Sequence, residues 1–142
     1  KYGDRVMVER YVHGRELTCA VMGDVALGVT EIVPQGHQFY DYDSKYIEAD
    51  GATLSIPAAI SEQEADHIRA ISKQVFSTLE CRGLSRVDVF LTNDGEVYIN
   101  EVNTMPGFTK ISMYPKLWEQ SGLPYAQLID QLIQFSIDDF QG

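Results

Sequence analysis

The sequence has few basic residues, few cysteines and no long apolar run. Lys and Arg number 11 against 21 Asp and Glu, a net charge of −10, so we expect no sequence-independent grip on nucleic acid and no attraction to an anionic membrane. The two cysteines form no CxxC pair, which favours a reducing, cytoplasmic location over secretion. No apolar run is long enough to cross a bilayer. Any handling of phosphate is therefore expected to use a bound metal ion.

The 142 residues, of which 44% are hydrophobic, suit one compact domain over residues 1–142. Strand-like patterns come first and helix-like patterns later, which predicts an α+β fold in which helices pack on an antiparallel sheet. Four early strands are expected from β-branched enrichment and alternation: 6–12, 16–22, 25–33 and 53–57. The first two should pair around a turn at His13 and Gly14.

Helices are predicted by capping residues and by apolar spacing. Ser61 and Glu64 form a capping box before an apolar stripe that ends at Leu79, and Gly83 should end this helix. A second helix is expected at about 111–120. A third should begin at Pro124, and its apolar pattern over 128–140 is expected to lie in the core, with an amphipathic face for a partner as the alternative.

Two further strands flank the turn dipeptide Asp94-Gly95. A two-residue hairpin turn there would pair Asn93 with Glu96. The same register sets Asp88 opposite Glu101 and Arg86 opposite Asn103. Because side chains alternate along a strand, these last four should share one face.

Two carboxylates lying directly opposite each other destabilise a sheet unless a cation lies between them. Arg86 can be that cation, so a plain ion pair is one interpretation. Asp88, Glu101 and Asn103 together are hard oxygen donors of the kind that Mg²⁺ prefers. The residue types favour a metal site, and the ion pair stays as the alternative.

Two loops carry further candidates. The small-residue loop 104–109 leads into a helix whose first amides lack intrahelical partners, so it can hold an anion. Gly107 allows close approach of the backbone, and Ser112 can donate a hydrogen bond; an ordinary turn is the alternative. The aromatic, polar segment 39–46 has no periodicity and is interpreted as a functional loop.

Together these motifs resemble the C-terminal part of D-alanine:D-alanine ligases of the ATP-grasp superfamily. The resemblance rests on Arg86-Val87-Asp88, on 99–109 and on 112–115; 39–46 is similar to the family's substrate loop and 8–12 to its adenine hinge. It covers nearly the whole chain. A full ligase also has an N-terminal domain and a central lid, so the partner expected for this chain is the N-terminal half of the same enzyme, and the 142 residues alone should be inactive.

The resemblance implies ATP-dependent ligation of two D-alanines to D-alanyl-D-alanine through a D-alanyl phosphate, for peptidoglycan synthesis. Asp88, Glu101 and Asn103 would hold two Mg²⁺ ions, or Mn²⁺ in their place. The implied catalytic residues are Arg86, Gly107, Lys45 and Tyr46. The implied nucleotide-binding residues are Glu9, Arg10, Val12, Glu16, Phe39 and Lys45. Ser112, Met113 and Tyr46 would bind the second D-alanine.

Two alternatives stay open. One is another ATP-grasp ligase that places D-serine or D-lactate second, although Tyr46 speaks against D-lactate. The other is a non-catalytic module that binds a nucleotide or a divalent cation. The full-length protein is expected to be a homodimer.

Overall fold

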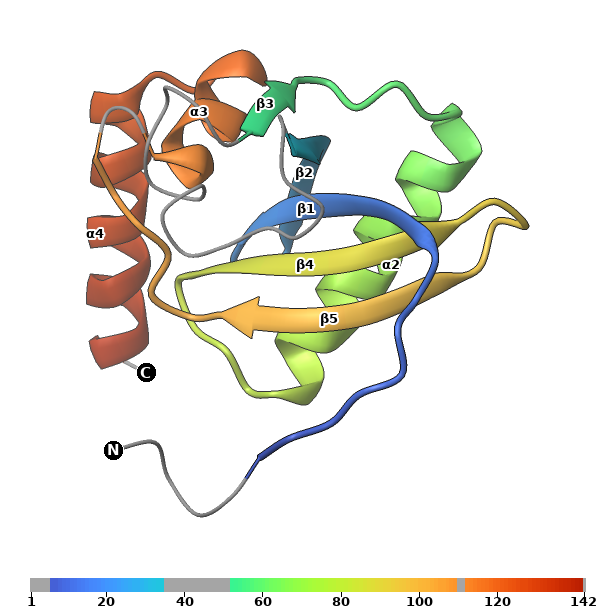
Figure 1. Ribbon diagram of the computed structural model, residues 1–142. Coiled ribbons are helices and arrows are strands. Elements are labelled where there is room, and N and C mark those ends of the chain that lie inside the picture. The colour runs from blue at the N-terminus through green and yellow to red at the C-terminus, as the bar shows by residue number, and fades with distance from the viewer. Residues whose placement is uncertain (1–5, 35–51, 110–111, 142) are drawn as a thin grey trace.

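The computed structural model describes residues 6–34, 52–109 and 112–141. These residues form five strands and three helices (Figure 1). The strands are β1 (Gly14–Met22), β2 (Val25–Pro34), β3 (Ala52–Ser55), β4 (Leu84–Thr92) and β5 (Val97–Asn103). The helices are α2 (Glu62–Thr78), α3 (Met113–Gln120) and α4 (Tyr125–Gln141).

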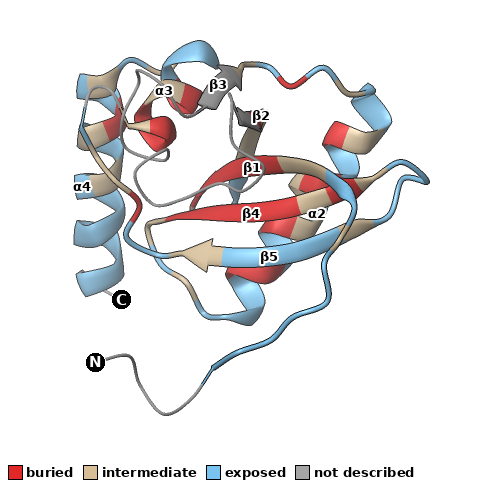
Figure 2. Cartoon of the chain, in the orientation of Figure 1, coloured by how far each residue is buried: buried red, intermediate tan, exposed pale blue. Residues whose placement is uncertain are grey.

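All five strands join in one sheet with the order β3-β2-β1-β4-β5, and every neighbouring pair is antiparallel. The expected α+β class with an antiparallel sheet is confirmed. Strands β1 and β4 lie in the middle and are mostly buried, whereas β5 is exposed along most of its length (Figure 2).

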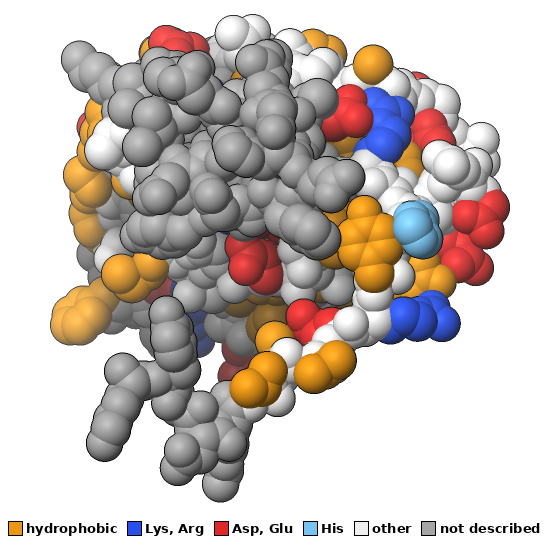
Figure 3. All heavy atoms as spheres, viewed as in Figure 1, with side chains coloured by type: hydrophobic (Ala, Val, Ile, Leu, Met, Phe, Trp, Pro, Cys, Tyr) orange, Lys and Arg blue, Asp and Glu red, His pale blue; other side chains and the backbone are white. Residues whose placement is uncertain are grey.

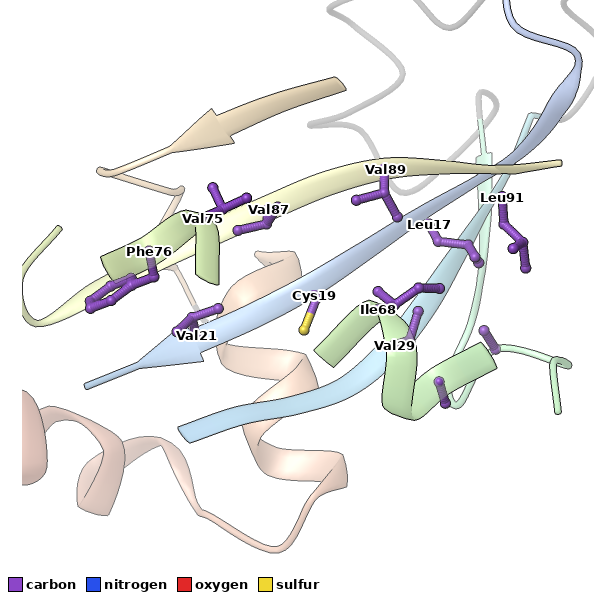
Figure 4. Packing of buried hydrophobic residues seen from close by; sticks show 12 residues of the cluster. Leu17, Cys19, Val21, Val29, Ile68, Val75, Phe76, Val87, Val89 and Leu91 are labelled. Atoms are coloured by element: carbon purple, nitrogen blue, oxygen red, sulfur yellow. The ribbon is translucent and has the colours of Figure 1, made fainter. Parts of the chain in front are cut away.

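One face of the sheet packs against α2. Alternation along β1 and β4 directs Leu17, Cys19, Val87 and Val89 to this face, where each is fully buried. Figure 4 shows these side chains facing Ile68 and other residues of α2. This layer is the larger hydrophobic core of the domain.

The opposite face is covered at one end by α3, with α4 packed beside it. Ala20 of β1 lies against Leu117 and Trp118 of α3. Tyr114 is buried there, and its hydroxyl donates to the carbonyl oxygen of Val21 at 2.9 Å, which fixes α3 on β1. The polar residues of β1 and β4 therefore lie on the same face as α3, further along the strands.

Helix α2 begins as predicted and ends earlier. Ser61 and Glu64 form the capping box, since each side chain meets the backbone amide of the other. The helix ends at Thr78, and the expected end at Gly83 is wrong. Glu80 has a φ of 52° and takes the left-handed position that glycine usually holds after a helix, while the Cys81 amide donates back to the Phe76 carbonyl.

The segment before β1 is not a strand, which corrects the prediction for 6–12. Both edges of β1 are occupied, by β2 and by β4, so no ladder position beside β1 is open to this segment. Val6, Met7 and Val8 are exposed instead, and hydrophobic side chains gather over this segment at the lower edge of Figure 3.

The apolar pattern of α4 is only partly core. Leu128 is fully buried, whereas Ile133, Phe135 and Phe140 are exposed, although the Phe135 ring lies close to Gly23 in the β1–β2 turn. The expectation that the pattern over 128–140 is core is therefore wrong for its later turns. No helix in the described ranges combines the length and apolarity needed to cross a membrane.

The β4–β5 turn has three residues rather than two. Thr92 faces Glu96, and its amide donates to the Glu96 carbonyl at 2.9 Å. Gly95 adopts a φ of 84° inside this loop. The predicted pairing of Asn93 with Glu96 is wrong, because Gly95 serves here as the left-handed residue of a longer turn.

Gly95→Ala should lower the free energy of unfolding by about 1 kcal/mol, because an L side chain is strained at positive φ. A Cβ at Gly95 would meet nothing within 4 Å, so the effect reports backbone strain alone. Gly28→Ala is the matched control, since its Cβ would meet only Ser121 Oγ at 3.6 Å. Urea denaturation can compare the two variants, and equal stabilities would contradict the strained turn.

Candidate active site

A bulge in β5 sets the residue that faces Asp88. Val89 pairs with Ile99, but the next pair is Asp88 with Glu101, so Asn100 is an extra residue in the ladder. Without this bulge, the three-residue turn would place Asn100 opposite Asp88. The bulge shifts the register by one residue and brings Glu101 to that position.

The pairings predicted for the acidic residues are therefore confirmed. Asp88 lies opposite Glu101, and Arg86 lies opposite Asn103. The turn and the bulge each shift the register by one residue in opposite senses, so the two departures cancel before Asp88 is reached. All four side chains share the face of the sheet that also carries α3.

Arg86 binds both carboxylates. Its Nε donates to Asp88 Oδ1 at 2.9 Å and its Nη2 donates to Asp88 Oδ2 at 2.7 Å. The same Nη2 lies 3.4 Å from Glu101 Oε1. Asp88 is 0% and Arg86 6% exposed, whereas the Glu101 side chain is half exposed. A fully buried carboxylate thus lies beside one that solvent and ligands can reach.

The donor set suits Mg²⁺. This ion takes one or two protein carboxylates and fills its other positions with water and substrate phosphate oxygens, and Asp88 and Glu101 supply two carboxylates on one face. The Asn103 side-chain oxygen accepts from the Met105 amide at 3.1 Å, so it is oriented by the following loop. Among the described residues, no group of three or more His, Cys, Asp or Glu side chains is arranged to hold a metal ion.

Strand β1 adds polar residues to the same face. Glu16 is half-buried, and Thr18, two residues further on, is fully buried. Thr18 pairs with Asp88 and also with Thr30 of β2. Glu16 was predicted from the sequence and both threonines were missed, although a hydroxyl two residues from a glutamate on a strand is a signal for a shared face.

The loop between β5 and α3 is held by hydrogen bonds between its own residues. Ser112 precedes α3, and its Oγ accepts from the Thr109 amide at 3.0 Å and lies 2.8 Å from Thr109 Oγ1. The Phe108 carbonyl accepts from the Tyr125 hydroxyl at 3.0 Å. Gly107 lies within this loop, four residues after Asn103, and Met113 begins α3.

Six further candidates lie either before β1 or outside the described residues. Glu9, Arg10 and Val12 lie in the segment before β1, where Glu9 and Arg10 are exposed and Val12 is half-buried. Three candidates lie outside the residues that the structure describes: Phe39, Lys45 and Tyr46.

Cys19 is not a nucleophile. It is fully buried, and its thiol lies 3.2 Å from the Leu27 carbonyl. Burial raises the pKa of the Cys19 thiol to about 11, so it stays protonated at neutral pH. Within the described ranges, the candidate reactive groups are therefore the carboxylates and Arg86.

The fold is that of a class of solved ligases. A D-alanine-D-alanine ligase from Coxiella burnetii superposes with a TM-score of 0.79 at 40% identity, over 94% of this chain and 34% of that one. A D-alanine--D-alanine ligase from Bacillus anthracis complexed with ATP gives a TM-score of 0.76 at 26% identity, over 94% of this chain and 42% of that one.

The sequence comparisons define the family. The family model described as "D-ala D-ala ligase C-terminus" matches residues 1–134, and the chain belongs to this family. A relative named D-alanine--D-alanine ligase, from Oceanobacillus iheyensis, is 50% identical over 141 residues. That match covers 97% of this chain and 38% of the relative, so the chain spans well under half the length of the relatives it matches.

Asp88→Asn should lower the free energy of unfolding by about 3 kcal/mol, because it removes the charge partner of the buried Arg86 guanidinium. Glu101→Gln, the matched control on the half-exposed partner, should cost less than about 1 kcal/mol. Both values can be measured by urea denaturation in the presence of EDTA. A larger loss for Glu101→Gln than for Asp88→Asn would contradict the importance of the buried pair.

Proposed function

We propose that the protein containing this chain joins two D-alanines into D-alanyl-D-alanine, with ATP as the phosphoryl donor and Mg²⁺ as the metal, and that it serves peptidoglycan synthesis. The chain would supply the acidic face that meets the ATP phosphates. The arrangement that carries this proposal is the opposed pair Asp88 and Glu101 with Arg86 bound between them. Membership of the ligase family supports it.

The reaction takes two displacement steps. A carboxylate oxygen of the first D-alanine attacks the terminal phosphorus of ATP and ADP leaves, which gives D-alanyl phosphate. The amine of the second D-alanine then attacks the carbonyl carbon, loses a proton, and inorganic phosphate leaves. Negative charge first spreads over the transferred phosphoryl group and then develops on the carbonyl oxygen.

Asp88, Glu101 and Asn103 would hold the metal ions. When bound, Mg²⁺ would neutralise phosphate charge and align the terminal phosphate with its acceptor. Asp88 is buried and oriented by two donors of Arg86, so it offers a fixed oxygen. Glu101 is half exposed, so it can adjust to a phosphate-bound ion.

Arg86 would stabilise the acyl phosphate and the tetrahedral intermediate. Its planar fork already grips a carboxylate in a bidentate manner, and an acyl phosphate offers a similar pair of oxygens. The Gly107 amide would serve as an oxyanion donor, and Lys45 would reach the transferred phosphate.

The other candidates would place the substrates. Glu16 would bind ribose hydroxyls from the face that carries Asp88. Glu9, Arg10, Val12 and Phe39 would surround the adenine. Ser112, Met113 and Tyr46 would bind the second D-alanine, and the position of Ser112 at the start of α3 supports capture of a carboxylate there.

Arg86→Lys in the full-length protein should lower kcat by about 100-fold while KM for ATP changes little, because the lysine keeps the charge but loses the fork that acts after ATP has bound. Steady-state kinetics with ATP and D-alanine, and with D-serine or D-lactate as second substrate, measures this. D-alanine should be the preferred second substrate.

Arg15→Lys is the matched control. Arg15 makes a comparable bidentate pair with Glu31 in the same sheet, with Nε to Oε1 at 2.7 Å and Nη2 to Oε2 at 2.5 Å, but it belongs to the face that packs on α2. Its kcat should stay at the wild-type value. A raised KM for ATP with unchanged kcat in Arg86→Lys would instead assign Arg86 to ordinary phosphate binding.

A further inference from the structure

A row of oxygen-bearing side chains crosses the sheet at the height of Asp88. Thr30 of β2 pairs with Thr18 of β1, Thr18 pairs with Asp88 of β4, and Asp88 pairs with Glu101 of β5. Directly paired residues in antiparallel strands share a face. The row therefore runs from two neutral hydroxyls to two carboxylates, and Thr18 is the neighbour of Asp88 on the side away from Glu101.

The two hydroxyls are buried without hydrogen bonds. Thr18 and Thr30 are each 0% exposed, and neither Oγ1 has a hydrogen-bond partner within the described ranges. A buried hydroxyl without a partner is unfavourable, and a valine of nearly the same shape would avoid the loss. Thr18 Oγ1 therefore makes no hydrogen bond within the described ranges, although Thr18 is paired with Asp88, the most buried carboxylate of the site.

Arg86 must change partners during the proposed reaction. In the structure its Nε and Nη2 donate to both oxygens of Asp88, which are the oxygens that a cation would approach. A guanidinium and a divalent cation repel each other, and the proposed role of Arg86 lies at the acyl phosphate. When Arg86 turns to the substrate, Asp88 loses the two short hydrogen bonds that Arg86 donates to it.

We propose that Thr18 is the positioning residue for Asp88. Its hydroxyl donates to the Asp88 carboxylate when Arg86 leaves, and it holds one carboxylate oxygen in place while the other binds the metal ion. Thr30 cannot do this, because it lies two strands from Asp88, at about 10 Å. This inference rests on the proposed function and adds a residue to its metal site.

Three variants of the full-length protein test the inference: Thr18→Val, Thr18→Ser and Thr30→Val. Mn²⁺ binding in the presence of ADP can be followed by the electron paramagnetic resonance signal of free Mn²⁺. Thr18→Val should weaken binding about tenfold, the usual effect of removing a group that orients a metal ligand. Thr18→Ser keeps the hydroxyl and should bind within about twofold of wild type, whereas Thr30→Val should match wild type.

Stability in EDTA separates positioning from packing. Thr18→Val and Thr30→Val should both unfold at urea concentrations equal to or above that of wild type, because each removes a buried hydroxyl without a partner. Weaker Mn²⁺ binding in a variant that is no less stable cannot be explained by a damaged sheet. Loss of stability in Thr18→Val together with weaker binding would overturn the inference.

The other outcomes are also decisive. Wild-type Mn²⁺ affinity in Thr18→Val, equal losses in Thr18→Val and Thr30→Val, or failure of Thr18→Ser to restore binding would each overturn the role of Thr18. In those cases, if the wild-type protein turns over ATP with D-alanine, the proposed function still stands. If the wild-type protein neither binds Mn²⁺ nor turns over ATP with D-alanine, the proposed function fails and the inference fails with it.

Discussion

The ion pair between Arg86 and Asp88 is the constraint on which the acidic face depends. Both residues are nearly free of solvent, and removal of water from two charges costs several kcal/mol for each ion. Only good geometry offsets that cost, and here one strand supplies it. Arg86 and Asp88 are two residues apart on β4, so the pleat of the strand fixes their separation, and β1 and β5 fix the strand on both sides.

The hydrophobic core on the other face makes this geometry rigid. Residues 86 and 88 of β4 point to the acidic face, while Val87 and Val89 point into the core against α2. A shift of the strand that moved Asp88 would also move these valines out of a close-packed layer. The α2 layer, which carries no residue of the proposed chemistry, therefore holds the Asp88 carboxylate in place.

How far the sequence predicts this site depends on which interactions are local. The capping box of α2 and the pairing of Asp88 with Glu101 were predicted correctly. The turn was not, because Asp94-Gly95 fits both a two-residue and a three-residue loop. The bulge at Asn100 restored the register, and no residue in the sequence marks it.

Non-local constraints explain the other departures. The segment 6–12 has strand-like residues, but it can form a strand only beside a free strand edge. Both edges of β1 are occupied, by β2 and by β4. Thr18 was missed because its environment is assembled from four strands. In the sequence of β1 alone, Thr18 is only a β-branched residue near Glu16.

The charge of the acidic face explains why Arg86 can serve two partners. Among the described residues, Arg86 binds the carboxylates of Asp88 and Glu101, and Glu16 adds a third carboxylate to the same face, so negative charge remains there for a cation to balance. In the proposed reaction, a cation bound at Asp88 would repel the Arg86 guanidinium and favour its move toward negative charge elsewhere. ATP and the acyl phosphate would bring that charge. Cation binding at Asp88 and delivery of Arg86 to the substrate would therefore be coupled by electrostatics, and the proposed hydrogen bond from Thr18 would let the arginine leave without loss of the metal ligand.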